Sequence, residues 1–151
     1  YEAYGPGGVA ILIEVFTDNR NRTVSNLKHI LLSSGGSLAN PGSVTRMFER
    51  KGVVRLKDPA EKNEALELKL IDAGAQDIKD EDGYMIVYSS PEKLKSITEA
   101  LGEIEPEYSG IEWIAKDKIS VIDPEIQEKL EKLYNALDED DDVNDYSSNQ
   151  A

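Results

Sequence analysis

The stretch from Gly8 to Gly36 constrains the fold most strongly, because a strand pattern, a polar turn and a helix pattern follow one another directly. Gly8 to Thr17 has apolar side chains on both faces, with Glu14 as the exception, which is typical of a covered strand. The polar string from Asp18 to Thr23 then forms a turn. The chain therefore begins as a strand followed by a helix.

The helix pattern starts at Thr23, which is expected to be the N-cap. Val24, Leu27, Ile30 and Leu31 follow at helical spacing. The pair Gly35-Gly36 is expected to end the helix, because glycine readily adopts the left-handed conformation found there.

Two short strands are expected next, at 43–49 and 53–57, joined in a hairpin by Arg50-Lys51-Gly52. Asp58-Pro59 then breaks the pattern and the composition turns acidic, so we expect a domain boundary there. A second α/β unit follows, with helices at 62–73 and 90–102, a hairpin turn at Asp82-Gly83, and strands at 84–88 and 110–115.

The last helix is expected to begin at Asp123-Pro124, because Ile126, Leu130, Leu133 and Leu137 recur at helical spacing. A short edge strand is expected at 143–146. Together with the first elements these complete the order strand-helix-strand-strand-helix-strand. The sequence therefore predicts an α+β protein, with a ferredoxin-like βαββαβ domain at 1–58 plus 122–151 and an acidic α/β domain inserted at 59–121.

Charge is distributed unevenly along the chain. The net charge of −13 would argue against a nucleic-acid partner, but residues 1–57 hold eight basic and four acidic side chains, whereas residues 58–151 hold nine basic and twenty-six acidic ones. Such asymmetry suggests an anion-facing surface on the first part and a repelling surface on the second.

Several classes of protein are excluded or disfavoured. The 151 residues contain no Cys, which excludes disulfides and thiolate chemistry, and a single His. No apolar run suits a membrane span and no signal-peptide pattern opens the chain, so a soluble, non-exported protein is expected. The chain begins with Tyr1 rather than Met, which we interpret as a missing N-terminal part.

The first candidate site is the turn Asn19-Arg20-Asn21-Arg22. Unpaired amides and the positive end of a helix favour an anion there, and two guanidinium groups can bind phosphates. The alternative, with even weight, is that the asparagines hold the turn while the arginines pair with Asp18 or Glu14. Lys28 and His29 on the same helix are expected to be exposed, and to be further nucleic-acid contacts rather than catalysts.

The second candidate site lies on the predicted hairpin and consists of Arg46, Arg50, Lys51, Arg55 and Lys57. Alternation places Arg55 and Lys57 on one face, toward solvent or RNA. The alternative, with equal weight, is that positive side chains on an edge strand prevent pairing between sheets.

Two further motifs carry little functional weight. The loop Tyr4-Gly5-Pro6-Gly7-Gly8 precedes a strand, whereas phosphate-binding loops precede a helix. The acidic run 138–142 lacks the glycine and glutamate spacing of a calcium loop. No metal site or cofactor is expected, and the acidic run is interpreted as a solvated helix exit.

Several segments resemble the YebC/PmpR family of transcriptional and translational regulators. They are Tyr1-Glu2-x-Tyr4-Gly5-Pro6-x-Gly8-Val9-Ala10, Thr17–Val24, Gly35-Gly36-Ser37-Leu38 with Gly42-Ser43-Val44, Ala73-Gly74-Ala75-x-Asp77, and Leu137–Val143. The resemblance covers essentially the whole chain. It implies a three-domain protein of which this chain supplies the second and third domains, without the basic N-terminal domain.

The resemblance implies a DNA-binding transcription regulator or a ribosome-associated translation factor, a group that includes a mitochondrial translational activator of cytochrome c oxidase subunit I. The acidic surface favours ribosome or rRNA binding over duplex DNA, by binding rather than catalysis. A protein-binding module that uses the acidic domain is a further alternative, and an acylphosphatase-like enzyme a weaker one. No membrane or small-molecule substrate is expected, and the location would be the cytoplasm, or the mitochondrion in a eukaryote.

Overall fold

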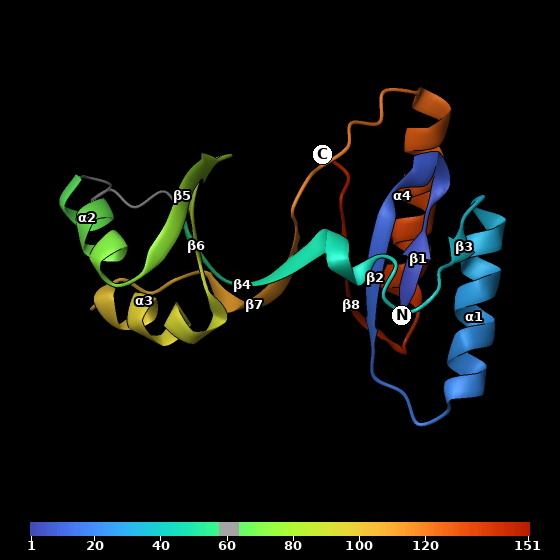
Figure 1. The fold of residues 1–151 in the computed structure, drawn as a ribbon, viewed down its shortest axis with the longest axis horizontal. Helices are drawn as coiled ribbons and strands as arrows, with labels where there is room; N and C mark the ends of the chain where they lie inside the picture. Colours follow the sequence, from blue (N-terminus) through green and yellow to red (C-terminus); the bar gives the residue numbers. More distant parts are fainter. Residues whose placement is uncertain (58–63) are drawn as a thin grey trace. The chain divides into compact units, whose positions relative to one another are not determined.

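A computed structural model describes residues 1–57 and 64–151, which form two compact units. Unit 1 contains residues 1–49 and 114–151, and unit 2 contains residues 50–113 (Figure 1). Each unit has helices beside a four-stranded sheet, so the predicted α+β class is confirmed. The predicted domain boundary near Asp58-Pro59 lies outside the described residues.

Unit 1 is built on a sheet with the strand order β3-β1-β2-β8, in which each neighbouring pair is antiparallel. The bounds of its elements are β1 Glu2–Tyr4, β2 Ala10–Val15, α1 Arg20–Ser33, β3 Ser37–Leu38, α4 Pro124–Glu139 and β8 Val143–Ser148, with 3-10 turns at Pro6–Gly8 and Thr45–Met47. This order differs from the expected βαββαβ. The chain opens with a β1–β2 hairpin, because the glycine-rich loop links two strands rather than preceding the first.

The core of unit 1 lies between this sheet and the helices α1 and α4. Leu27 and Leu31 of α1 and the leucines 130, 133 and 137 of α4 pack against Ala3, Val9, Ile11 and Ile13. Both helices therefore cover the same face of the sheet. The predicted last helix is confirmed, and its N-cap is Asp123, whose carboxylate accepts a hydrogen bond from the Glu125 amide.

Unit 2 is built on a second sheet with the order β5-β6-β4-β7. Its elements are β4 Phe48–Lys57, α2 Glu64–Asp72, β5 Ala75–Glu81, β6 Tyr84–Ser89, a 3-10 turn Pro91–Lys93, α3 Leu94–Ala100 and β7 Tyr108–Ala115. Both β4 and β7 run from one unit into the other. The core residues Val54, Leu56, Met85 and Val87 face α2 and α3, so one face of the sheet is covered by helices.

The predicted hairpin at 43–57 is wrong. Residues 45–47 form a 3-10 turn, and Phe48–Lys57 is one continuous strand. Gly52, expected to form the turn, is instead buried opposite Ser89, where an added Cβ would lie 3.2 Å from Leu94 Cβ of α3. Gly52 lacks a side chain and so leaves space for the helix α3 against the strand. From the sequence alone, a glycine with this role looks the same as a glycine in a turn.

Among the described residues, no helix is long and apolar enough to cross a membrane. The predicted Asp82-Gly83 turn is confirmed, with φ of 50° and 80° at the two residues, between β5 and β6. Gly35 also adopts the left-handed conformation predicted for the end of α1, with φ of 83°.

Candidate nucleic-acid interface

The turn between β2 and α1 positions the first group of candidate residues. Helix α1 begins at Arg20, and Asn19 is its N-cap, because the Asn19 side chain accepts a hydrogen bond from the Arg22 amide at 3.1 Å. The prediction that Thr23 caps this helix is therefore wrong by one turn. Within residues 1–57 and 64–151, no hydrogen bond uses the amide of Arg20 or Asn21.

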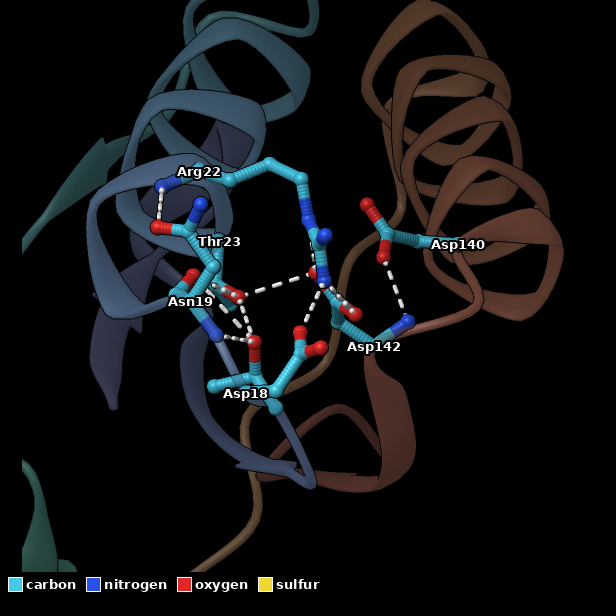
Figure 2. Close-up of polar contacts among 7 residues, drawn as sticks. Asp18, Asn19, Arg22, Thr23, Asp140 and Asp142 are labelled. Atoms are coloured by element: carbon cyan, nitrogen blue, oxygen red, sulfur yellow. Dashed lines mark hydrogen bonds and ion pairs between the residues drawn. The ribbon is translucent and has the colours of Figure 1, made fainter.

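Arg22 is held by carboxylates within unit 1, as Figure 2 shows. Its Nε and Nη2 donate to the two oxygens of Asp142 at 3.2 and 2.9 Å, and Nη2 also donates to Asp18 at 3.1 Å. The Asp142 side chain is only 12% exposed. Hydrogen bonds from Arg22 and then from Thr23 hold the pKa of Asp142 below its ordinary value, and the bond with Asp142 raises the pKa of Arg22.

Thr23 and Asp142 join α1 to the segment after α4. The buried Thr23 hydroxyl lies 2.9 Å from Asp142 Oδ2, and the Asp142 amide donates to Asp140 Oδ1 at 2.9 Å. The acidic run 138–142 is thus not simply a solvated helix exit, because its last residue turns inward to bind α1. The sequence-based alternative that the arginines pair with Asp18 or Glu14 is confirmed for Arg22 and Asp18. Asp142 was missed because it lies 120 residues away in the sequence.

Arg20 differs from Arg22 because its side chain is exposed and has no ion pair in the part of the chain that the structure describes. It lines an open hollow with Tyr1, Val15, Phe16 and Thr17. Phe16 is 88% exposed although it directly follows β2. Sequence reasoning placed Phe16 in the apolar strand and missed it as a surface residue.

The other unit 1 candidates are exposed, and all of them except Asn21 lie away from this turn. Lys28 and His29 are exposed on α1, and His29 lines a second open hollow with Lys129 and Lys132 of α4. Arg46 is exposed on the 3-10 turn Thr45–Met47. Asn21 is exposed beside Arg20.

Glu2 fixes the segment that carries Arg46. Its carboxylate accepts hydrogen bonds from the amides of Gly42, Val44 and Thr45 and from the Thr45 hydroxyl. Desolvation works against ionisation of Glu2, but these hydrogen bonds, with those from Thr45 first, outweigh it and lower the pKa of Glu2 to about 2. The carboxylate therefore stays ionised and ties the loop to β1.

The second group of candidates lies on β4 in unit 2. Arg50 lies over the ring of Trp113 at 6.0 Å, Lys51 over Tyr88 at 5.9 Å and Arg55 over Tyr84 at 5.7 Å. Because β4 has neighbours on both sides, protection of a sheet edge does not explain its basic residues. Sequence reasoning missed the aromatic partners, since they come from strands distant in the sequence.

Comparison with known proteins shows which family this chain is related to. A family model described as the second and third domain of TACO1/YebC matches residues 1–150. The chain therefore belongs to the TACO1/YebC family. The resemblance drawn from the motifs is confirmed.

Individual TACO1/YebC relatives agree with this assignment. The chain is 43% identical over 151 residues to a protein of Leptospira biflexa and 42% identical over 151 residues to one of Thermotoga maritima, both named probable transcriptional regulatory protein. These matches cover 99% of this chain and 61% and 59% of the relatives, so the chain spans about three fifths of their length. It is also similar to the crystal structure of a conserved hypothetical protein from Aquifex aeolicus, Aq1575, with a TM-score of 0.88 and 37% identity over 100% of this chain and 63% of that one.

In this TACO1/YebC chain the candidate residues thus fall into two groups on separate units. The α1 group contains Asn19, Arg20, Asn21 and Arg22, with Lys28, His29 and Arg46 elsewhere on unit 1, and the β4 group contains Arg50, Lys51, Arg55 and Lys57. Within the α1 group, Asn19 and Arg22 have structural partners, while the side chains of Arg20 and Asn21 are exposed and make no hydrogen bond or ion pair within the described residues.

Proposed function

We propose that this chain is the RNA-contacting part of a regulator of gene expression that acts in translation by binding the ribosome or its RNA. The observation that carries the proposal is the exposed Arg20 at the start of α1, which has no ion-pair partner among the described residues and lies beside the exposed ring of Phe16. A guanidinium group, unpaired amides and a helix N-terminus together attract phosphate, while an exposed ring can stack on a base.

Charge supports RNA in a large assembly over duplex DNA. A protein that lies along a duplex needs many basic contacts, but this chain has a net charge of −13. A ribosomal site requires only one patch to meet RNA while the remaining acidic surface faces away. The action would take place in the cytoplasm, or in the mitochondrion of a eukaryote.

The names of the relatives keep transcription as the second candidate. Probable transcriptional regulatory proteins are expected to contact DNA, and the relatives are longer than this chain. Transcriptional regulation through a duplex is therefore the alternative that the experiment must separate.

A binding role is favoured over catalysis by the contacts at the α1 turn. An acylphosphatase-like site would use Arg20 and Asn19 to hold the substrate, but the Asn19 side chain is engaged as the cap of the helix. Among the described residues, no group of three or more His, Asp or Glu side chains is arranged to hold a metal ion. The proposed function is binding, without bond chemistry or a cofactor.

The experiment is co-sedimentation of the chain with ribosomes across a salt series, beside binding to duplex DNA. Arg20→Ala is expected to weaken ribosome association several-fold and to reduce its salt dependence, with an unchanged melting temperature. Lys132→Ala is the matched control, because Lys132 is an exposed cation 3.5 Å from Glu128 on α4. Equal sedimentation of Arg20→Ala and the parent chain, or binding to the duplex alone, would overturn the proposal.

If the chain instead binds a protein partner through the acidic unit 2, the sedimentation experiment should give a different result from that expected for RNA binding. Association that survives nuclease treatment and does not depend on Arg20 would favour that module. The same salt series distinguishes it, because binding to ribosomal RNA should be lost when the RNA is digested.

A further inference from the structure

The sheet of unit 2 has one face that no described helix of this unit covers. The residues of this open face follow from strand alternation and register: Tyr84, Ile86 and Tyr88 on β6 lie opposite Lys57, Arg55 and Val53 on β4 and opposite Glu81, Lys79 and Asp77 on β5. The alternating residues Val54, Leu56, Met85 and Val87 face the helices instead. The open face therefore has half-buried aromatic rings on a central strand, between two strands that carry exposed cations. Val53 and Ile86 on the same face are buried, so the rings and the cations form its accessible surface.

We infer that this open face binds single-stranded RNA, with Tyr84 and Tyr88 stacking against bases and Arg55, Lys57 and Lys51 contacting the backbone. The inference rests on the proposed function for the choice of RNA and adds a second contact surface to it. It assigns to unit 2, whose residues 50–113 hold nine basic and fifteen acidic side chains, a direct role in binding rather than in repulsion.

The arrangement of charge supports this ligand. Lys51, Arg55 and Lys57 alternate along β4, so they form a basic stripe on one face of an internal strand. The acidic neighbours Asp77 and Glu81 lie on β5, with Lys79 between them. A third carboxylate, Glu112 of β7, also acts electrostatically on the Tyr88 ring, so the cations of this face are concentrated on β4 and not spread over its neighbours. The phosphate backbone would therefore follow β4, where the face is positive.

The rings favour unpaired bases over a duplex. Arg55 lies 5.7 Å from the centroid of Tyr84, and Lys51 and Lys79 lie 5.9 and 5.7 Å from that of Tyr88. Tyr84 and Tyr88 are half-buried, so their positions are set by the sheet before any ligand arrives. Single-stranded nucleic acids bind on such preformed aromatic and basic surfaces because their bases are free to stack, whereas the bases of a duplex are not.

An acidic peptide is the main competing ligand, since it also matches a basic stripe. It would use the cations but gain little from the rings, whereas RNA would use both. Loss of the rings at constant charge therefore separates the two ligands. A further alternative is that the cation–π contacts only stabilise the positions of the tyrosine rings within the sheet. That alternative predicts that neither RNA nor an acidic peptide binds this face.

The experiment is fluorescence anisotropy of the full chain with labelled oligouridine of about 12 nucleotides, with a matched RNA duplex and polyglutamate as further probes. Tyr84→Leu/Tyr88→Leu keeps the charge and apolar bulk and is expected to weaken oligouridine binding about tenfold or more. Arg55→Gln/Lys57→Gln is expected to weaken binding and to reduce the slope of log K against log salt by about 1.4. Lys93→Gln/Lys95→Gln is the charge-matched control and should bind like the parent chain, because these exposed lysines lie in the turn before α3 and on α3, which covers the other face of the sheet.

Three results would overturn the inference: no oligouridine binding by the parent chain, equal binding by the tyrosine double variant, or polyglutamate binding stronger than that of oligouridine. Thermal unfolding of each variant shows whether it is folded, and Tyr84→Leu alone replaces the double variant if the latter is unfolded.

The experiments can refute the inference and the proposed function independently of each other. Ribosome sedimentation that depends on Arg20 but not on the tyrosines would uphold the proposed function alone, whereas oligouridine binding without sedimentation would uphold the open face alone.

Discussion

At the scale of single residues, Arg20 and Arg22 show how differently two nearby arginines can be used. Arg22 meets Asp142 through a two-point hydrogen bond, and this partner keeps it within unit 1. Arg20 has no such partner among the described residues and faces the hollow beside Phe16. We therefore expect the two side chains to separate experimentally into a structural arginine and a binding arginine.

Arg22→Ala is predicted to lower the melting temperature by several degrees, because it leaves the largely buried Asp142 without its cation. Arg22→Ala/Asp142→Ala should lose less than the sum of the single variants, since it removes both charges together. Thermal unfolding of the four proteins measures this coupling. Strictly additive losses would mean that the pair does not connect α1 to the segment after α4.

Glu2 gives a pH-dependent prediction. Its folded pKa of about 2 lies below the ordinary value of 4.5, so the unfolded chain binds the proton more readily. The stability from Glu2 is therefore fully present above about pH 4.5 and is lost as the pH falls toward 2. Glu2→Gln should cost about 1 kcal/mol at pH 7 after allowance for solvent screening, and less at pH 3.

Urea unfolding of Glu2→Gln at both pH values measures this difference. Glu131→Gln, at an exposed position on α4, is the matched control and should behave like the parent chain at each pH. A cost for Glu2→Gln that stays constant from pH 7 to pH 3 would show that the charge of Glu2 does not matter.

At the scale of elements, patterns within a short window predicted the structure well. Helix α4 has its cap, its proline and its leucines close together in sequence, and it forms where expected. Strand β1 was missed because three residues next to a glycine-rich loop give too short a pattern. The predicted hairpin at β4 was wrong because Gly52 packs against Leu94 of α3, a residue far from it in the sequence.

The same limit applies to the candidate sites. The basic residues were visible in the sequence, and so was the nearby partner Asp18 of Arg22. The distant partners were not, since Asp142 and Tyr84 reach Arg22 and Arg55 only through the fold. The choice between a binding cation and a structural one depends on those partners. Sequence alone therefore left both alternatives open at the α1 turn.

Gly36→Ala is predicted to destabilise unit 1 by roughly 1–3 kcal/mol, because a Cβ at Gly36 would collide with the backbone carbonyl of Tyr4. The backbone of β1 cannot relieve this clash by changing rotamer, as a flexible side chain could. Urea unfolding measures the loss. The comparison is Gly35→Ala, where no atom lies within 4 Å of the added Cβ and only the φ of 83° opposes the substitution. A smaller loss at Gly36 than at Gly35 would contradict close packing of this turn on β1.

At the scale of the whole molecule, the acidic excess opposes both folding and RNA binding. Each of the units carries fifteen acidic side chains, against eight basic ones in unit 1 and nine in unit 2. Like charges repel one another in the folded state, and the same charges repel phosphate. The proposed binding to RNA would then depend on cations without carboxylate partners among the described residues, such as Arg20 at the α1 turn, and on the basic residues along β4.

Salt should therefore act in opposite directions on stability and on binding. Raising NaCl from about 10 to about 150 mM shortens the screening length from about 30 Å to about 8 Å. This relieves the repulsion among acidic side chains, so the melting temperature should rise by a few degrees. It also weakens the attraction of phosphates to the basic groups, so oligouridine and ribosome binding should fall about tenfold or more.

One salt series, followed by thermal unfolding and by fluorescence anisotropy, tests on the same protein both the expected rise in stability and the expected fall in binding. Binding that strengthened with salt would point to an apolar protein contact, because no interaction between a cation and a phosphate gains from screening.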